Sequence, residues 1–445
     1  MYVDRANQAS IYDSFNSPFV SVLLGPRRVG KSTLVSQYAK QHNNYKWAFL
    51  NMDNYVQRER IEKNELRNLI QEEAAQQIGV GSKLWVSIDE AQKCPALFDQ
   101  VKLLYDNYKD EAVIKFILTG SGLLSLHKLG SETLAGRATL QFLHEFNLQE
   151  TLNLIHSEKI LKKSFFDIIE NDIVQEDDSV NSSIIESYVE SVSPLRPTAE
   201  KCLSELMIWG GFPEVLLQRD EKSKENYLRN YLQTYMEKDV RAIQTVHDVN
   251  LYQKLLDIIA EQTGSIKEDK KIIEALGCSR DTLKKYRGFL LATLMYKEIY
   301  PFIHQPLKRI VKSPKGYLLN NGLISHLVGI SDEKILQKTG LMGHRFENWF
   351  LNELQTWLNR DYKRSEIYYW RTFSGQEVDF VVQKKPYVFP FEVTYSKNIL
   401  DKKIKNLRTF MQDEKKAKIG FYIYLGNFRY DAQAKIFFIP AWGIL

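Results

Sequence analysis

The chain has 445 residues, 44% of them hydrophobic, and a formal net charge of +5. Because one hydrophobic core rarely serves so long a chain, we expect two to four domains. The sequence contains no leader-like start, no run of eighteen apolar residues and no paired spacing among its three cysteines. These features argue against a secreted protein, a membrane span, a disulfide framework and a cysteine zinc site, and they indicate a cytoplasmic protein that needs no membrane partner.

Short apolar segments alternate with longer helical patterns over residues 1–150. The segments cover residues 20–24, 47–51, 84–88, 114–119 and 139–143. Such alternation predicts an α/β domain with a parallel sheet covered by helices.

A phosphate-binding motif follows the first apolar segment. It reads G-x-x-x-x-G-K-S-T and consists of Gly25, Pro26, Arg27, Arg28, Val29, Gly30, Lys31, Ser32 and Thr33. The glycines let backbone N–H groups turn toward a phosphate, the lysine reaches the β- and γ-phosphates, and the serine hydroxyl is a ligand for Mg²⁺. The motif predicts that ATP and Mg²⁺ bind here.

Two later segments end in polar residues that would complete this site. The segment 84–88 is followed by Asp89 and Glu90, and the segment 114–119 ends at Thr119, close to Ser121. In a parallel sheet these ends lie beside the phosphate loop. We expect Asp89 to hold Mg²⁺ and Glu90 to polarise the attacking water. Thr119 and Ser121 would sense the γ-phosphate or cap the following backbone.

Arg137 precedes the fifth apolar segment. An arginine in such a loop can neutralise transition-state charge, often in a neighbouring subunit, or form a surface ion pair.

From residue 151 to about 245 the pattern is helical and predicts a lid. Between Lys163 and Arg196 it carries eight acidic residues and no basic one, which predicts a partly flexible, solvated insertion. Residues 246–315 hold three short helical patterns and then a β-like segment, the order of a winged helix. On its third helix Arg280, Lys284 and Arg287 share one face, which suits either a DNA-recognition helix or a structural lid extension.

Taken together, the motifs GPRRVGKST, LWVSIDEAQ, ILTGSG, LAGRA, GGFP and YMEKDVR resemble those of prokaryotic AAA-type ATPases of the archaeal-ATPase group. The resemblance implies Walker A at residues 25–33, Walker B at residues 84–90, sensor 1 at residues 119–121 and an arginine finger at Arg137. It also places Pro213, in a lid motif, near the adenine, and it implies a ring-like or dimeric homo-oligomer.

Residues 316–445 predict a separate α/β domain. A turn near Lys385 and Pro386 would pair residues whose numbers add to 771, and it therefore sets Asp379 opposite Glu392. Facing carboxylates repel by up to about 1 kcal/mol, so either a divalent metal or an ion pair with nearby lysines or Arg371 must neutralise them.

This segment resembles the PD-(D/E)xK nuclease core, and the resemblance implies a Mg²⁺ site formed by Glu347, Asp379 and Glu392. Position 394 is threonine where the motif has its catalytic lysine. Either Lys397 takes over that role, or the domain is a restriction-endonuclease-like fold without activity.

The sequence therefore predicts a P-loop ATPase core (1–150), a helical lid with an acidic insertion (151–245), a winged helix (246–315) and a nuclease-like domain (316–445). From Pro301 onward the sequence has 23 Lys and Arg but only 13 Asp and Glu. This basic excess indicates either a binding surface for a polyanion such as DNA or a solvated lysine surface. We expect Mg²⁺-dependent ATP hydrolysis coupled to nucleic-acid handling. The alternative is an ATP-driven switch that acts on a protein partner and cleaves nothing.

Overall fold

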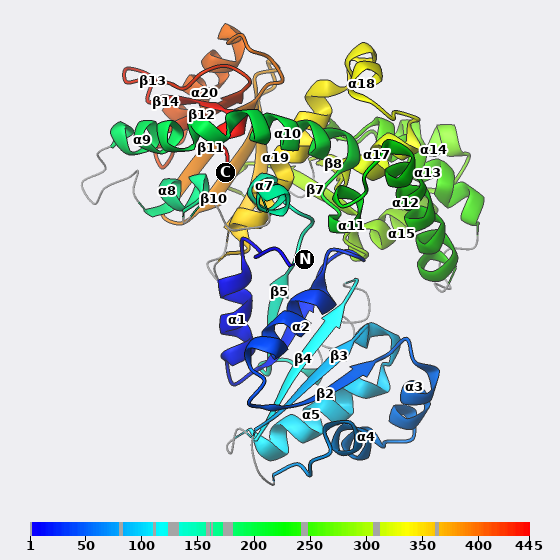
Figure 1. Cartoon of the computed structure of the whole chain (residues 1–445). Coiled ribbons are helices and arrows are strands. Elements are labelled where there is room, and N and C mark those ends of the chain that lie inside the picture. The colour runs from blue at the N-terminus through cyan, green and yellow to red at the C-terminus, as the bar shows by residue number, and fades with distance from the viewer. Residues whose placement is uncertain are drawn as a thin grey trace.

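The computed structural model describes residues 2–79, 83–109, 113–122, 133–156, 161, 163–171, 181–241, 248–305, 312–360 and 365–445. A lobe built around β1 to β5 lies below a larger lobe of helices and a second sheet, and the N-terminus lies where they meet (Figure 1). Among the described residues, no helix has the length and apolar character needed to cross a membrane.

The smaller lobe confirms the predicted parallel α/β domain. Its strands lie in the order β2-β3-β4-β1-β5, and every pairing is parallel. The strands are β1 (Val20–Leu24), β2 (Lys46–Asn51), β3 (Leu84–Asp89), β4 (Ile114–Gly120) and β5 (Ala138–Phe142). The helices are α1 (Gln8–Asn16), α2 (Lys31–Gln41), α3 (Tyr55–Glu62), α4 (Leu66–Ala74) and α5 (Ala96–Tyr108).

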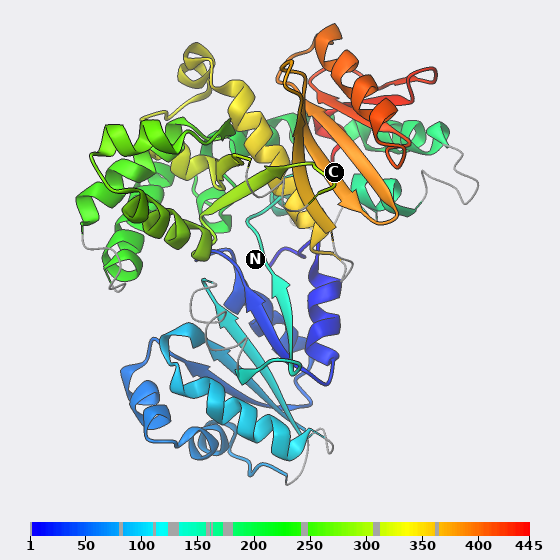
Figure 2. The ribbon, with the colours of Figure 1, turned by 180° about the vertical axis from the view of Figure 1, so that it is seen from behind.

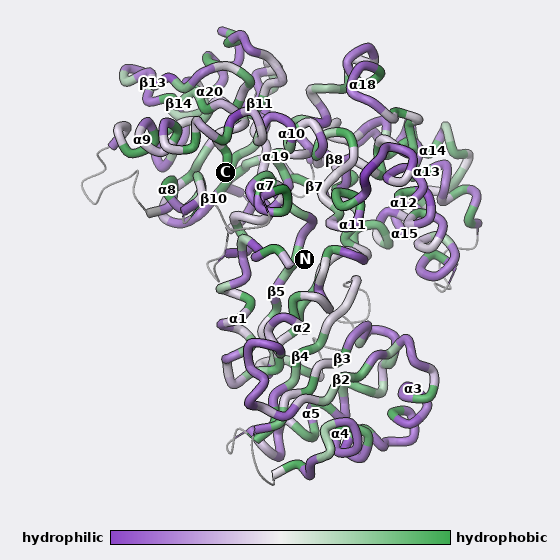
Figure 3. The backbone as a smooth tube through the Cα atoms, viewed as in Figure 1, coloured by the Kyte–Doolittle hydropathy of each residue, from purple (hydrophilic) through white to green (hydrophobic). Residues whose placement is uncertain are grey.

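Burial follows position in this sheet. The inner strands β1 and β4 are buried along their whole length, whereas the edge strand β2 alternates between buried and exposed residues. Strands covered on both faces read as continuous apolar runs. In Figure 3, where the chain is coloured by residue hydropathy, many hydrophilic residues lie on the outer helices α3 and α4 of this lobe.

A helical region follows β5. It comprises α7 (Leu148–His156), α8 (Phe165–Asn171), α9 (Ser182–Val192), α10 (Arg196–Trp209), α11 (Pro213–Leu216), α12 (Glu221–Thr234) and the π-helix η4 (Tyr235–Val240).

The sequence predicted a partly flexible, solvated insertion for the acidic stretch, but its described parts are packed into the core and are not solvated along their whole length. Phe165 and Phe166 on α8 and Ile185 on α9 are buried in the main core. Their apolar faces outweigh the charges on the opposite faces, because helical spacing separates the two kinds of residue. Residues 172–180 lie outside the described residues.

The next unit has the order α13 (Val249–Glu261), β6 (Ser265–Ile266), α14 (Asp269–Leu276), α15 (Arg280–Ala292), β7 (Tyr296–Pro301) and β8 (Lys315–Leu318). Strand β8 pairs antiparallel with both β6 and β7. The domain boundary expected at residues 315 and 316 therefore falls inside a paired strand.

The C-terminal unit continues the same sheet, in the order β13-β14-β12-β11-β10-β9-β7-β8-β6. Its strands are β9 (Ser365–Arg371), β10 (Glu377–Lys384), β11 (Tyr387–Val393), β12 (Gly420–Tyr424), β13 (Arg429–Asp431) and β14 (Ile436–Pro440). Its helices are α17 (Asn321–Leu327), α18 (Glu333–Thr339), α19 (Met342–Leu358) and α20 (Asp401–Asp413). Helix α20 lies against this sheet, on the side seen from behind (Figure 2).

Candidate nucleotide site

The phosphate loop joins β1 to α2 and requires glycine at both ends. Gly30 is the N-cap residue of α2 and has φ of 98°, in the left-handed region that glycine adopts without strain. A Cβ on Gly25 would lie 2.1 Å from the carbonyl oxygen of Leu143, just after β5. The loop is therefore held tightly against the C-terminal edge of the sheet.

Lys31 lies inside this loop. Its Nζ donates to the carbonyl oxygens of Gly25 at 2.9 Å and Pro26 at 2.8 Å. Burial lowers the pKa of the Lys31 ammonium to about 8, although Glu90 and Asp89 act in the opposite direction. The ammonium therefore lies among the backbone groups that would surround a phosphate.

This pKa predicts that ATP affinity depends on pH. Bound phosphates favour the ammonium form and raise its pKa, so ATP binding above pH 8 must take up a proton. As far as Lys31 determines it, the affinity for ATP should be constant below pH 8 and should fall by up to about tenfold per pH unit above pH 8. Calorimetry in buffers of different ionisation enthalpy should show uptake rising toward one proton at pH 9, and no uptake there would contradict the assignment.

The structure brings together Ser32, Asp89 and Thr119. Ser32 Oγ donates to Asp89 Oδ2 at 2.8 Å, and the Thr119 hydroxyl donates to the other oxygen of the same carboxylate. The hydroxyl of α2 and the carboxylate of β3, both predicted as Mg²⁺ ligands, are thus in direct contact.

Glu90 and Ser121 form a second group beside this one. Ser121 Oγ donates to Glu90 Oε2 at 3.2 Å, and Gln92 Nε2 donates to both Glu90 Oε2 and Ser121 Oγ. Glu90 has φ of 52°, which is uncommon for a residue other than glycine. The sequence reading missed Gln92, although its position two residues after Glu90 could have indicated it.

The helical region that follows β5 contacts the phosphate loop through ion pairs. Arg27 contacts Asp239 of η4 at 2.7 Å, and Arg28 contacts Glu214 of α11 at 3.5 Å. Burial raises the pKa of Asp239 to about 6, although Arg27 acts in the opposite direction. Pro213 begins α11 beside these contacts. Asp239 was not predicted as a site residue, although it lies in the quoted YMEKDVR motif.

The GGFP segment connects this helical region to the residues after β5. Gly211 donates through its N–H to Glu145 at 3.1 Å and accepts from the N–H of Phe146 at 2.8 Å. Asn320, which follows β8, also donates to Glu145. Burial raises the pKa of Glu145 to about 7. The Glu145 carboxyl group, just after β5, thus contacts the helical region through Gly211 and the end of the β6–β8 unit through Asn320.

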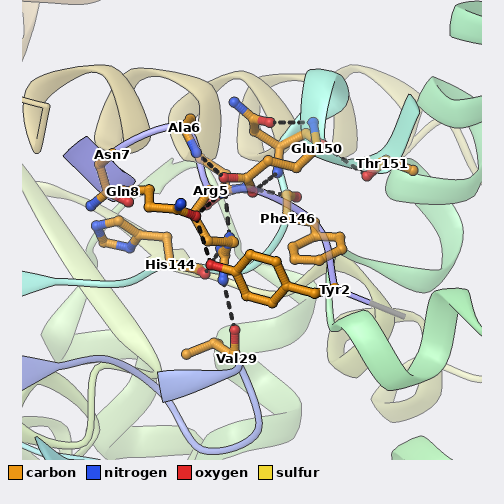
Figure 4. Close-up of polar contacts among 12 residues, drawn as sticks. Tyr2, Arg5, Ala6, Asn7, Gln8, Val29, His144, Phe146, Glu150 and Thr151 are labelled. Atoms are coloured by element: carbon orange, nitrogen blue, oxygen red, sulfur yellow. Dashed lines mark hydrogen bonds and ion pairs between the residues drawn. The ribbon is translucent and has the colours of Figure 1, made fainter. Parts of the chain in front are cut away.

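Arg5 was also missed, and it is the residue that connects the N-terminal segment to the loop (Figure 4). Its guanidinium donates to the carbonyls of Val29 at 2.8 Å and His144 at 2.6 Å, and contacts Glu150 of α7 at 3.1 Å. The side chains of Arg5 and Glu150 are 5% and 2% exposed. No local motif marks Arg5, because its partners lie up to 145 positions away.

We expect Arg5→Ala to lower the free energy of unfolding by about 3–5 kcal/mol, because it leaves the Glu150 carboxylate buried without its charged partner. Urea unfolding measures the loss. Arg5→Ala combined with Glu150→Gln should recover part of it, and equal losses in the single and double variants would contradict this reason.

Arg137 is not brought to the nucleotide loop of its own chain. It lies before β5, at the N-terminal ends of the parallel strands, whereas the phosphate loop lies at their C-terminal ends. Its side chain pairs with Asp106 at 2.7 Å. Its role as an arginine finger stays a prediction about a neighbouring subunit.

In the C-terminal unit, the hairpin register is as predicted. The pairs run from Phe380 opposite Phe391 to Lys384 opposite Tyr387, and all add to 771. Lys403 of α20 contacts both Asp379 and Glu392. This agrees with the expected ion pair with a nearby lysine, whereas Arg371 pairs with Glu377. Lys397, which was considered for the lysine role of the nuclease motif, is exposed.

The third expected ligand, Glu347 on α19, lies near this pair. Burial and the charge of Asp379 raise the pKa of Glu347 to about 7. Within the described ranges, no group of three His, Cys, Asp or Glu side chains is arranged to hold a metal ion. Metal binding by these three carboxylates stays a prediction.

The prediction that Arg280, Lys284 and Arg287 form one basic face on α15 is partly wrong. Arg287 is buried and binds both carboxylate oxygens of Asp269, at 2.6 and 2.9 Å. Arg280 and Lys284 are exposed. Arg287 turns inward because Asp269 on α14 and Glu298 on β7 neutralise it.

Comparison with protein families gives three matches. Residues 17–152 match a model described as an AAA domain. Residues 200–334 and 342–444 match models of two domains of unknown function, DUF8612 and DUF4143.

Similar proteins of two bacteria span most of this chain. An uncharacterized protein of Mycobacterium tuberculosis is 23% identical over 448 residues, covering 100% of this chain and 85% of that protein. One from Haemophilus influenzae is 22% identical over 390 residues, covering 85% and 83%.

Among solved structures, the Aeropyrum pernix ORC1 protein in complex with DNA matches with a TM-score of 0.30 at 12% identity, covering 76% of this chain and 95% of that one. The Thermotoga maritima RuvB Holliday junction branch migration motor matches with a TM-score of 0.32 at 12% identity, covering 76% of this chain and 95% of that one. The AAA domain match covers the smaller lobe, and the loop between β1 and α2 in that lobe has the glycines and the buried lysine of a P-loop.

Proposed function

We propose that this chain binds and hydrolyses ATP with Mg²⁺ and couples the nucleotide state to nucleic-acid handling by its larger lobe. The observation that carries the proposal is the contact of Ser32 with Asp89 beside the buried ammonium of Lys31. These residues provide a cation for the phosphates and two oxygen ligands for a metal ion, all at the C-terminal ends of the parallel strands.

The residues present fit Mg²⁺. A hydroxyl and a carboxylate 2.8 Å apart are the oxygen ligands that this ion prefers. When bound, the ion neutralises charge on the phosphate oxygens. Backbone N–H groups and Lys31 orient the phosphates, while Glu90, held by Ser121 and Gln92, accepts hydrogen bonding from the attacking water.

Contacts across the lobes support the coupling. Arg27 and Arg28 in the phosphate loop reach η4 and α11 of the lid, and Glu145 joins the chain after β5 to Asn320 of the larger lobe. A shift of the phosphate loop on nucleotide binding would therefore act on the helical region that follows β5 and, through it, on the rest of the larger lobe.

The β6–β8 unit and the charge of the chain favour nucleic acid as the partner. Its element order, α-β-α-α-β-β, is typical of a winged helix, a fold that commonly contacts DNA. On α15, Arg280 and Lys284 are exposed, and Gly288, one turn after Lys284, has nothing near its Cβ position. A phosphate backbone could approach this face closely.

Binding of labelled duplex and single-stranded DNA, with ATP analogue or ADP at several salt concentrations, tests the coupling. We expect salt-dependent binding that changes with the nucleotide and weakens in Arg280→Glu/Lys284→Glu. Lys40→Glu/Lys109→Glu makes the same charge change at exposed positions of the smaller lobe and should have little effect. Loss of binding in both variants alike, or no binding at all, would contradict the proposal.

The second candidate is an ATP-driven regulatory switch that acts on a protein partner without cleaving nucleic acid. The contact of Lys403 with Asp379 and Glu392 favours it, because the carboxylates of the nuclease-like motif are already neutralised. Incubation of DNA and RNA with Mg²⁺ or Mn²⁺ should leave them intact, whereas cleavage that Asp379→Ala abolishes would exclude this candidate.

A further inference from the structure

Lys403, whose side chain is 24% exposed, contacts two buried carboxyl groups in the C-terminal unit. Its Nζ lies 2.7 Å from Asp379 Oδ2 and 3.0 Å from Glu392 Oε2, and it donates to the carbonyl of Val393 at 2.8 Å. The N–H of Val393 donates to Asp379 at 2.8 Å. Asp379 and Glu392 are 6% and 1% exposed, so the ammonium is the charged group that holds the two carboxyl groups together.

Helical spacing places this lysine inward. On α20, Lys403, Leu407 and Phe410 follow one another at intervals of four and three residues and therefore share a face, and the latter two are fully buried. Lys402 and Lys405 on the same helix are exposed. Burial alone would lower the pKa of Lys403, but Asp379 and Glu392 raise it above its ordinary value.

A second lysine neutralises the remaining carboxylates. Lys315 at the start of β8 is 5% exposed, contacts Glu377 at 2.5 Å and lies 4.0 Å from Glu347. Burial raises the pKa of Asp379, but Lys403 and Lys315 together hold it down, at about 2. The positive charge that a metal would bring to this site is therefore already supplied by the chain.

The position where the nuclease motif has lysine does not contribute. Thr394 follows β11, and its buried hydroxyl has no hydrogen-bond partner among the described residues. Neither oxygen of Glu392 has a hydrogen-bond partner within the same part of the chain. Burial and the charge of Asp379 raise the pKa of Glu392 well above its ordinary value, and Lys403 acts in the opposite direction. The residues present do not fit a divalent metal while Lys403 is in place.

We propose that the Lys403 ammonium takes the place of a divalent metal between Asp379 and Glu392. The C-terminal unit then needs no metal for its fold, and removal of the ammonium converts the pair into a divalent cation site. The proposal rests on the non-cleaving form of the proposed function, and its test separates the two by measuring metal binding and ATP turnover independently.

The experiment compares the full-length wild type with Lys403→Met, without nucleotide, by Mn²⁺ titration followed by electron paramagnetic resonance. We expect Lys403→Met to bind one additional Mn²⁺ per chain, at least tenfold more tightly than any site in the wild type. Adding Asp379→Asn should abolish this binding. Lys403→Arg, which keeps the charge, and Lys402→Met, an exposed neighbour, should behave as the wild type, and all variants should retain ATP turnover.

Thermal unfolding gives a second readout. Mn²⁺ should raise the Tm of Lys403→Met and leave that of the wild type unchanged. If Lys403→Met is unfolded without metal, refolding in Mn²⁺ supports the proposal and failure to refold counts against it. Wild-type Mn²⁺ binding that Asp379→Asn removes, or a folded Lys403→Met without added Mn²⁺ affinity, would overturn the proposal. Loss of ATP turnover in every protein would instead refute the proposed ATPase.

Discussion

Glu90→Gln is expected to slow ATP hydrolysis by at least about a hundredfold, because a positioned general base contributes 10²–10⁴ in rate. Glutamine keeps the size of the side chain and can still contact Ser121 and Gln92, the partners of Glu90 in the structure. ATP binding should therefore remain. Steady-state phosphate release and titration with a fluorescent ATP analogue measure the two quantities separately.

Glu73→Gln provides the matched control, since Glu73 is an exposed glutamate of the same lobe and its substitution should change neither quantity. Turnover of Glu90→Gln at the wild-type rate would refute the role given to Glu90. Loss of both binding and turnover would show that its carboxylate serves the loop and not the reaction.

Lys31→Ala is expected to weaken ATP binding by about a hundredfold, because hydrogen bonds to charged groups contribute about 1.5–3 kcal/mol each and the ammonium would contact more than one phosphate oxygen of bound ATP. The substitution also removes a buried charge that hydrogen-bonds to Gly25 and Pro26. Unfolding curves should accompany the ATP titration, so that a loss of affinity is not confused with a loss of fold.

Lys40→Ala, on the exposed end of the same helix, should bind ATP as the wild type does. A folded Lys31→Ala protein whose ATP affinity stays within twofold of the wild type would contradict the assignment of the loop.

The parts of the site that sequence predicts are those carried by local patterns. The phosphate loop, Asp89 and Glu90 lie in motifs that continue directly from buried strands, and parallel strands bring such ends together. The register of Asp379 and Glu392 followed from the position of one turn, because a hairpin turn fixes the pairing of its strands.

The parts that sequence did not predict depend on contacts between distant segments. Arg5, Asp239 and Lys403 act through partners on other elements, and no spacing within their own segments names those partners. Lys403 left one usable signal, since it shares a helical face with Leu407 and Phe410. Arg287 was misassigned for the same reason: its acidic partners lie on neighbouring elements.

The nucleotide site is best tested by a crystal structure with Mg²⁺ and a non-hydrolysable ATP analogue. Lys31 Nζ is expected to leave the carbonyls of Gly25 and Pro26 for the β- and γ-phosphates, and Ser32 and Asp89 are expected to lie at the same Mg²⁺. A nucleotide bound elsewhere, or Ser32 and Asp89 too far apart to share one ion, would contradict the assignment of this site.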